Sequence, residues 1–94
     1  MQRKLSLVIP TYNERENIIK LIDRLAWQFE RHHIAAEIIV VDDNSPDGTG
    51  DLVAGYKYKN LKLVRRAGKQ GLSSAVIAGW RVASGDVLGV MDAD

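Results

Sequence analysis

The sequence predicts one α/β domain, a Rossmann-like three-layer α/β/α arrangement in which a mainly parallel sheet lies between helices. Across the 94 residues, four apolar, β-branched runs alternate with three helix-like segments, and no repeat or low-complexity linker interrupts them. Three runs are almost continuously apolar, as expected of parallel strands covered on both faces. A β-α-β-α-β-α-β order with right-handed crossovers gives half of a Rossmann-like domain.

The strands and helices follow from these runs and from the spacing between them. The predicted strands cover residues 5–10, 37–42, 61–65 and 87–91. Apolar residues at helical spacing predict a helix between the first two strands. They are Ile18, Ile22, Leu25 and Phe29. A further helix over about residues 72–84 would end at Gly85, as a left-handed C-cap.

Capping residues predict where the first two helices begin. Asn13 with Glu16 three positions later has the spacing of a capping box, which would open the first helix. Ser45 as N-cap and Pro46 at the first helical position would open a second, weaker helix after the second strand.

Composition excludes several classes of protein. The formal charge of +1 gives no general field that would attract nucleic acid, so no nucleic-acid partner is expected. The absence of cysteine excludes disulfides and thiolate metal sites. The apolar run after the basic N-terminus has five residues, too few for a signal peptide or a spanning helix. We expect a cytoplasmic protein, or one held at the cytoplasmic face of a membrane by partners or by segments beyond this sequence.

Two carboxylates directly follow the last apolar run. Asp92 and Asp94 are two residues apart, and side chains at that spacing in a strand point to the same face. Such a pair can hold Mg²⁺ or Mn²⁺, which complete their coordination with water and substrate phosphates. The sequence therefore predicts a divalent metal and a phosphorylated ligand. Because the sequence stops at this motif, we expect it to be the N-terminal part of a longer protein.

Polar residues follow all four predicted strands. These residues are 11–14, 42–45, 65–66 and 92–94. In open parallel sheets, ligands bind in the crevice outside the carboxyl ends of the strands. The sequence therefore predicts that the four segments converge on one crevice.

The individual residues of this crevice each have a functional and a structural interpretation. Asp42 and Asp43 can accept hydrogen bonds from a base or ribose, or cap a turn and a helix. Tyr12 can stack on a base or cover the sheet edge. Glu14 can bind base or sugar, or favour the positive end of the first helix.

Three basic residues after the third strand, Arg65, Arg66 and Lys69, can neutralise a diphosphate or simply be solvated. Neither a P-loop nor a Gly-x-Gly-x-x-Gly motif is present. We therefore expect metal and side chains, rather than a glycine-rich loop, to hold the phosphates.

Four ordered segments resemble the family 2 glycosyltransferases, which have the GT-A fold, and within them the dolichol-phosphate mannosyltransferase subfamily. The segments read VIPTYNEREN from Val8, VVDDNSPDGT from Val40, GLSSAV from Gly71, and SGD and MDAD near the C-terminus. The resemblance spans nearly the whole chain. It implies a domain over residues 1–94 that binds the nucleotide sugar and is truncated after the Asp-x-Asp motif, so that alone it would be poorly active.

The resemblance implies metal-dependent transfer of a hexose, from GDP-mannose, to a polyprenyl (dolichyl) phosphate at the membrane, with inversion at the anomeric carbon. Residues matching the family's nucleoside site are Pro10, Tyr12, Glu14, Val41 and Asp43, with Asp42 adjacent. Asp92, Ala93 and Asp94 match the diphosphate site. Asp92 and Asp94 would be the metal ligands and the catalytic residues.

Two alternatives stay open. One keeps the chemistry but uses a UDP-glucose type of donor, with undecaprenyl phosphate or a saccharide as acceptor. The other is a receiver-like or nucleotide-sensing module in which Asp42 and Asp43 hold magnesium without catalysis. It leaves Asp92-Ala93-Asp94 unused, and its acidic pair would be expected after the first strand. The sequence leaves the oligomeric state open.

Overall fold

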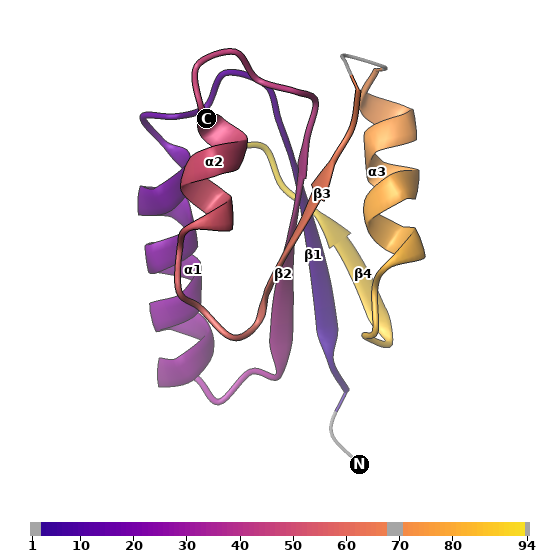
Figure 1. The fold of residues 1–94 in the computed structure, drawn as a ribbon. Coiled ribbons are helices and arrows are strands. Elements are labelled where there is room, and N and C mark those ends of the chain that lie inside the picture. Colours follow the sequence, from indigo (N-terminus) through magenta and orange to yellow (C-terminus); the bar gives the residue numbers. More distant parts are fainter. Residues whose placement is uncertain (1–2, 68–70, 94) are drawn as a thin grey trace.

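Four parallel strands form one sheet with the order β3-β2-β1-β4 (Figure 1). The strands are β1 (Leu5–Thr11), β2 (Ala36–Asp42), β3 (Leu61–Arg65) and β4 (Val87–Val90). This computed structural model describes residues 3–67 and 71–93. In the register, Thr11 lies opposite Asp42, and Asp42 lies opposite Arg65. The predicted parallel sheet is confirmed, and the strand bounds differ from the prediction by one residue at most.

Helices cover both faces of the sheet. The helices are α1 (Ile18–Arg31), α2 (Thr49–Ala54) and α3 (Leu72–Arg81). Figure 1 shows α1 and α2 on one face and α3 on the other. The predicted three-layer α/β/α architecture is therefore confirmed.

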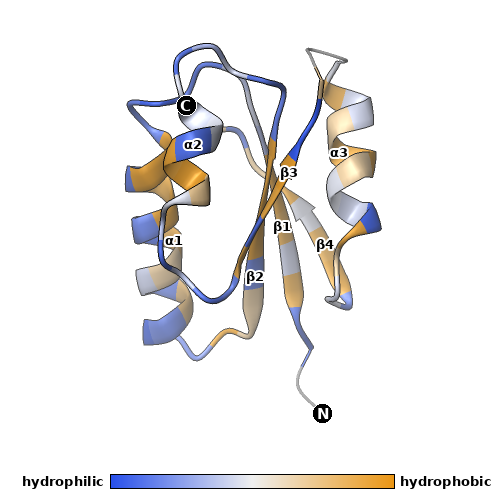
Figure 2. Cartoon of the chain, in the orientation of Figure 1, coloured by the Kyte–Doolittle hydropathy of each residue, from blue (hydrophilic) through white to orange (hydrophobic). Residues whose placement is uncertain are grey.

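Alternate residues of the central strands fill two separate apolar layers. Ile9 and Val40 pack with Ile18 and other residues of α1 on one face. Val8 and Val41 pack with Ala75 of α3 on the other. Residues that alternate along a strand point to opposite faces, which accounts for the almost continuously apolar sequence of β1 and β2. Polar residues gather instead in the loops at the carboxyl ends of these strands (Figure 2).

Gly79 allows α3 to lie directly on the sheet. A Cβ atom at this position would lie 2.6 Å from Cγ1 of Val8 and 3.1 Å from Cγ2 of Val41. Any side chain here would push the helix away from β1 and β2. The first turn of α3 lies at the carboxyl end of the sheet (Figure 1). The contact at Gly79 therefore also sets how close this turn lies to the strands.

The predicted capping box at the start of α1 is wrong. The helix begins at Ile18, and the N–H groups of Asn17 and Ile18 both donate to the carbonyl of Glu14. Asn13 has a left-handed backbone, with φ at 57°, and its N–H donates to Oγ of Ser45. Asn13 is therefore part of a loop joined to the neighbouring loop, which sequence spacing alone does not reveal.

The other predicted helix ends also differ from the structure. α2 begins at Thr49 rather than Pro46, because Ser45 bonds to Asp42 and it is Asp47 that accepts the N–H of Thr49. α3 ends at Arg81, so Gly85 does not cap it. Gly85 lies against β1 instead, where its N–H donates to Oγ of Ser6 and a Cβ would meet the Lys4 carbonyl at 2.6 Å.

A buried carboxylate fastens the amino end of the sheet. Glu37 of β2 is 2% exposed and accepts hydrogen bonds from Ser6 of β1 and from the backbone and hydroxyl of Ser84. Lys62 of β3 lies 2.9 Å from its other oxygen. Burial acts to raise the pKa of Glu37, but these bonds together outweigh burial and lower the pKa to about 2. Glu37 therefore joins three strands and the segment before β4.

β4 is only partly covered. It pairs with β1 alone within the described residues, and Val87, Leu88 and Val90 are each more than 40% exposed. Within the described residues, β4 is therefore an exposed edge of the sheet. No helix in the described ranges 3–67 and 71–93 has the length and apolar character needed to cross a membrane.

Candidate functional site

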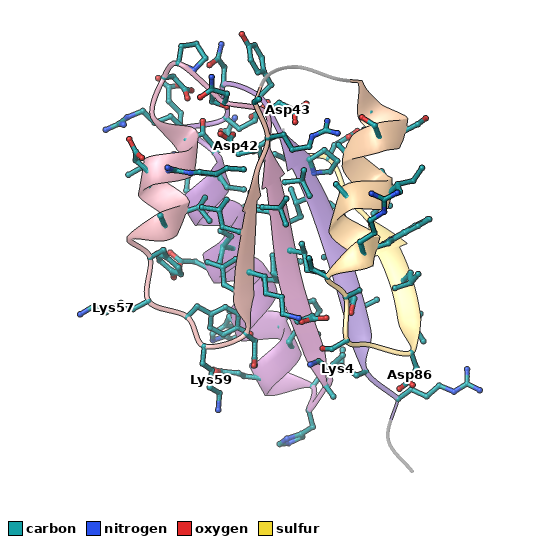
Figure 3. All side chains as sticks on the ribbon, turned by 45° about the vertical axis from the view of Figure 1, so that its right-hand side comes forward. Lys4, Asp42, Asp43, Lys57, Lys59 and Asp86 are labelled. Atoms are coloured by element: carbon teal, nitrogen blue, oxygen red, sulfur yellow. The ribbon has the colours of Figure 1, made fainter. Side chains whose placement is uncertain are left out.

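Functional side chains gather at the carboxyl end of the sheet. Figure 3 shows Asp42 and Asp43 at this end, with Lys4 and Asp86 at the opposite end. The N–H of Asp43 donates to the carbonyl of Thr11, which holds the loops after β1 and β2 side by side. The loops after the strands therefore come together where a parallel sheet is expected to bind ligands.

A cleft with an empty volume of about 570 Å³ lies between the end of β1 and the start of α3. Its lining residues are Pro10, Thr11, Tyr12, Glu14, Asp43, Gly71, Leu72 and Ala75. Four of these, Pro10, Tyr12, Glu14 and Asp43, are among the nucleoside-binding residues predicted from the sequence. The cleft combines two carboxylates and a phenol with an apolar wall from α3, which suits a flat polar ring joined to a hydroxylated sugar.

Asp43 is held in place by a two-pronged ion pair. Nε of Arg66 donates to one carboxylate oxygen at 2.6 Å, and Nη2 donates to the other at 2.9 Å. Both side chains are only 9% exposed. The hydrogen bond to Asp43 raises the pKa of Arg66 although burial acts to lower it. Arg66 is therefore committed to Asp43 rather than presented to the cleft as a diphosphate contact.

Asp42 holds the loops together through hydrogen bonds, which is the structural one of the two roles that the sequence left open. Its carboxylate is 2% exposed and accepts the Thr11 hydroxyl at 2.8 Å, the Ser45 hydroxyl at 2.6 Å and the Ser45 N–H at 3.0 Å. It lines a smaller polar hollow of about 320 Å³, together with Arg65 and Asp51. Arg65 pairs with Asp51 at 2.6 Å there, and Asp43 does not line this hollow. Of the two aspartates, only Asp43 lines the main cleft.

The alternative in which Asp42 and Asp43 jointly hold magnesium is not supported by this geometry. Asp42 bonds to Thr11 and Ser45, while Asp43 bonds to Arg66. An arginine on one carboxylate opposes the binding of a cation between the two. The side chain of Val41 is fully buried beneath α3 and does not line the cleft, so a contact of Val41 with the nucleoside stays a prediction.

Three consecutive backbone N–H groups of the loop between β1 and α1 donate to side chains of the segment that joins β2 to the start of α2. Asn13 donates to Ser45, Glu14 donates to Thr49 at 3.0 Å, and Arg15 donates to the Asp47 carboxylate at 3.1 Å. Thr49 is fully buried. Desolvation acts to raise the pKa of Asp47, but the bonds from Thr49 and Arg15 outweigh it and lower the pKa.

Sequence reasoning missed Ser45, Asp47 and Thr49 as residues that position the site. Their signal is the alternation of short oxygen-bearing side chains in Ser45-Pro46-Asp47-Gly48-Thr49, which favours side-chain to backbone bonding over helix. Because they accept the N–H groups of Asn13, Glu14 and Arg15, they fix the loop that carries Tyr12 and Glu14.

The residues after β4 are only partly within the described structure. The N–H of Met91 donates to the Val8 carbonyl, so the ladder carries Asp92 to the carboxyl end of the sheet. Asp92 is exposed, whereas Ala93 is 8% exposed and packs with the residues of α1. Asp94 lies outside the described residues, and so does Lys69.

Metal binding at this end stays a prediction. Within residues 3–67 and 71–93, no three His, Asp or Glu side chains lie close enough to hold a metal ion. The exposed Asp92 carboxylate, which makes no hydrogen bond or ion pair within those ranges, has the oxygen chemistry that Mg²⁺ and Mn²⁺ prefer. Asp92 could therefore serve as one coordinating residue of such a metal site.

A family model and a sequence relative both indicate the same family of proteins. The model of the family described as Glycosyl transferase family 2 matches residues 6–94. A dolichol-phosphate mannosyltransferase from Pyrococcus furiosus is 49% identical over 92 residues, which cover 97% of this chain and 26% of that protein. The chain therefore spans about a quarter of this relative.

Two solved structures share the fold and carry bound nucleotides. The mannosyltransferase PcManGT from Pyrobaculum calidifontis, in complex with GDP-Man and Mn²⁺, superimposes with a TM-score of 0.85 and 28% identity, covering 100% of this chain and 28% of that one. Glucosyl-3-phosphoglycerate synthase from Mycobacterium tuberculosis, in complex with Mn²⁺, UDP and phosphoglyceric acid, gives a TM-score of 0.76 and 26% identity, covering 98% of this chain and 33% of that one.

Proposed function

The chain belongs to glycosyl transferase family 2, with the GT-A fold, and from this premise we propose that it forms the donor-nucleotide part of a mannosyltransferase that uses GDP-mannose. The observation that carries the proposal is the cleft at the carboxyl end of β1. It combines Pro10, Tyr12, Glu14 and Asp43, contributed by two loops that are bonded to each other. The 49% identity to a dolichol-phosphate mannosyltransferase supports mannose as the sugar.

In this proposal the cleft holds the nucleoside. Tyr12 is 41% exposed at its edge, where its ring can stack on a base. The carboxylates of Glu14 and Asp43 accept hydrogen bonds from N–H groups of the base and hydroxyls of the ribose. Leu72 and Ala75 of α3 supply the apolar wall. Guanine carries several N–H donors, so two acidic residues at one cleft suit it.

The diphosphate would extend from this cleft toward the end of β4. Asp92 lies at the carboxyl end of β4, which is paired with β1, the strand that leads into the nucleoside cleft. Asp92, with Asp94, would hold Mg²⁺ or Mn²⁺. A bound divalent cation neutralises negative charge on a departing diphosphate. The role of the two aspartates is to fix the leaving group relative to the sugar.

The acceptor in this proposal is a polyprenyl phosphate at a membrane surface. Its phosphate is already anionic near neutral pH, so the attacking oxygen needs no dedicated general base. Attack on the anomeric carbon from the side opposite the diphosphate forms the new C–O bond as the old one breaks. The configuration therefore inverts, and mannose would be transferred as the β anomer.

A second donor has specific support. The Mycobacterium tuberculosis structure that shares this fold holds UDP, and Asp43 with Tyr12 can serve a uracil as well as a guanine. A UDP-sugar donor is therefore the alternative within the same reaction class.

Two separate binding titrations test the choice of donor. The protein is saturated with Mn²⁺ and titrated with GDP-mannose and, separately, with UDP-glucose. Tighter binding of GDP-mannose supports the proposal, whereas tighter binding of UDP-glucose moves the protein to the alternative donor. Binding of neither would overturn the assignment of the cleft. NMR of the transferred product tests inversion, because an α-linked mannosyl phosphate would contradict it.

A further inference from the structure

Arg66 joins three elements around the proposed nucleoside cleft without lining it. Nε and Nη2 of its guanidinium donate to the two oxygens of Asp43. Nη1 donates to the hydroxyl of Ser74 at 2.6 Å, and Nη2 also donates to the carbonyl of Gly71 at 3.3 Å. Its backbone N–H donates to the carbonyl of Asp42 at 2.9 Å. Arg66 thus connects the ends of β2 and β3 with the first turn of α3.

Every guanidinium nitrogen of Arg66 has a protein partner, so the side chain is not arranged to receive a phosphate. Among these partners, Asp43 and Gly71 line the cleft, whereas Arg66 does not. Arg66 therefore lies behind the cleft wall and acts on a ligand only through the residues that it holds.

The ion pair between Arg66 and Asp43 is largely shielded from water. Loss of either partner is therefore expected to have a large effect on the other. At 9% exposure each, the two side chains have little water to replace a lost partner. Bidentate arginine–carboxylate pairing fixes the plane of the carboxylate as well as its charge. Removing one member of such a pair leaves an uncompensated charge. Without Arg66, Asp43 would lose both hydrogen bonds that fix its orientation.

We propose that Arg66 is a positioning residue for nucleoside recognition, which holds the Asp43 carboxylate in a single orientation as an acceptor and ties the first turn of α3 to it. The proposal rests on the proposed function, since it needs the cleft to bind a nucleoside. It differs from the expectation that Arg66 neutralises a diphosphate, because the effect of Arg66 would be the same whether or not the ligand carries phosphates.

The neighbouring arginine gives a matched control. Arg65 pairs with Asp51, which is 84% exposed, and lines the smaller hollow rather than the cleft. The variants Arg66→Met, Arg66→Lys and Arg65→Met are titrated with guanosine and with GDP in the presence of diamagnetic Mg²⁺, using NMR to measure weak binding. Circular dichroism checks that each variant is folded.

The positioning role predicts an equal loss for both ligands. We expect Arg66→Met to weaken guanosine and GDP binding alike, by about tenfold, as for a disrupted charged hydrogen bond. Arg66→Lys keeps the charge but not the fork and is expected to lose about threefold. Arg65→Met is expected to stay within about twofold. A loss confined to GDP would show a phosphate contact and overturn the proposal.

A double-mutant cycle with Asp43→Asn separates action through Asp43 from a general effect on folding. In the Asp43→Asn background, adding Arg66→Met should produce a further loss of guanosine binding well below the tenfold expected in the unaltered protein, because only the bonds to Ser74 and Gly71 remain to be lost. A full additional tenfold loss would contradict the proposal. If Arg66→Met is unfolded, Arg66→Lys decides the matter through the same comparison of guanosine with GDP.

Different results would contradict the proposed function and the positioning role of Arg66. If the unaltered protein binds neither guanosine nor GDP, the proposed function fails. If it binds both, and folded Arg66→Met and Arg66→Lys proteins bind them as tightly, the positioning role of Arg66 fails while the proposed function stands.

Discussion

The carboxylate of Asp47 accepts the backbone N–H of Arg15 at 3.1 Å and thereby joins the loop before α1 to the loop before α2. The same carboxylate accepts the N–H and hydroxyl of Thr49, whose oxygen in turn accepts the N–H of Glu14. The two loops that carry Tyr12, Glu14 and Asp43 therefore form one bonded unit. Such preorganisation reduces the entropy lost when a ligand binds.

Thr49→Val tests this bonded unit. The two side chains have nearly the same shape, but valine has no hydroxyl. The variant therefore leaves the Glu14 N–H without its acceptor and removes one of the two hydrogen bonds that Thr49 donates to Oδ1 of Asp47. We expect a loss of roughly 1–3 kcal/mol in the free energy of unfolding, measured with urea, together with weaker nucleotide binding. Thr49→Ser keeps the hydroxyl and should lose only about 0.8 kcal/mol for the missing methyl. Equal stability of Thr49→Val and the unaltered protein would contradict the role of this hydroxyl.

Glu37 predicts a specific acid sensitivity. Its pKa in the folded protein is about 2, below the ordinary value of 4.5 expected in the unfolded chain. The stabilisation is therefore complete above about pH 4.5 and is lost as the pH falls from there toward 2. Glu37→Gln should cost on the order of 2 kcal/mol at pH 7, because the half-exposed lysine partners moderate the effect.

Urea unfolding from pH 7 to pH 2.5 checks this prediction. The unaltered protein should lose more stability than Glu37→Gln between about pH 4.5 and the acid limit. Parallel pH profiles for the two proteins would mean that Glu37 does not provide the stabilisation.

Gly79→Ala should destabilise the protein although alanine favours helix more than glycine does. A Cβ at this position meets Val8 at 2.6 Å, which forces α3 away from the sheet. Overpacking of this kind costs about 1–3 kcal/mol, against a gain of about 1 kcal/mol in helix propensity. Gly55→Ala is the matched control, since its Cβ would meet only backbone oxygens at 3.6 and 3.9 Å. A stabilised Gly79→Ala protein would refute the close approach.

Asp92→Ala tests the metal assignment. If Asp92 is a ligand, the variant should lose at least about tenfold in Mn²⁺-dependent nucleotide affinity. Asp86→Ala is the control, because Asp86 lies at the opposite end of β4 and accepts the N–H of Lys4 (Figure 3). Equal metal dependence in both variants, measured by titration with and without chelator, would remove Asp92 from the metal site.

The sheet was predictable because its signal is local. Parallel strands that are buried on both faces need continuous apolar runs. The run from Ile38 to Val41 fits such a strand better than any other element. The gathering of Tyr12, Glu14 and Asp43 followed from the rule that carboxyl ends of parallel strands meet at one edge.

The helix ends and the partners of charged residues were not predictable in the same way. Asn13 and Ser45 both suit an N-cap in isolation, but each is bonded to a residue from another loop. Arg66 finds its carboxylate 23 positions earlier in the chain, across the β2–β3 pair. Such choices depend on register and packing, which a local pattern does not contain.

Calorimetric titration with GDP-mannose, in Mn²⁺ and again in chelator, tests whether the cleft is a metal-dependent donor site. We expect saturable binding in Mn²⁺ that is lost or strongly weakened in chelator, and lost again in Asp43→Ala. A folded protein that binds no nucleotide sugar in Mn²⁺ would contradict the claim that the cleft beside β1 is a donor site.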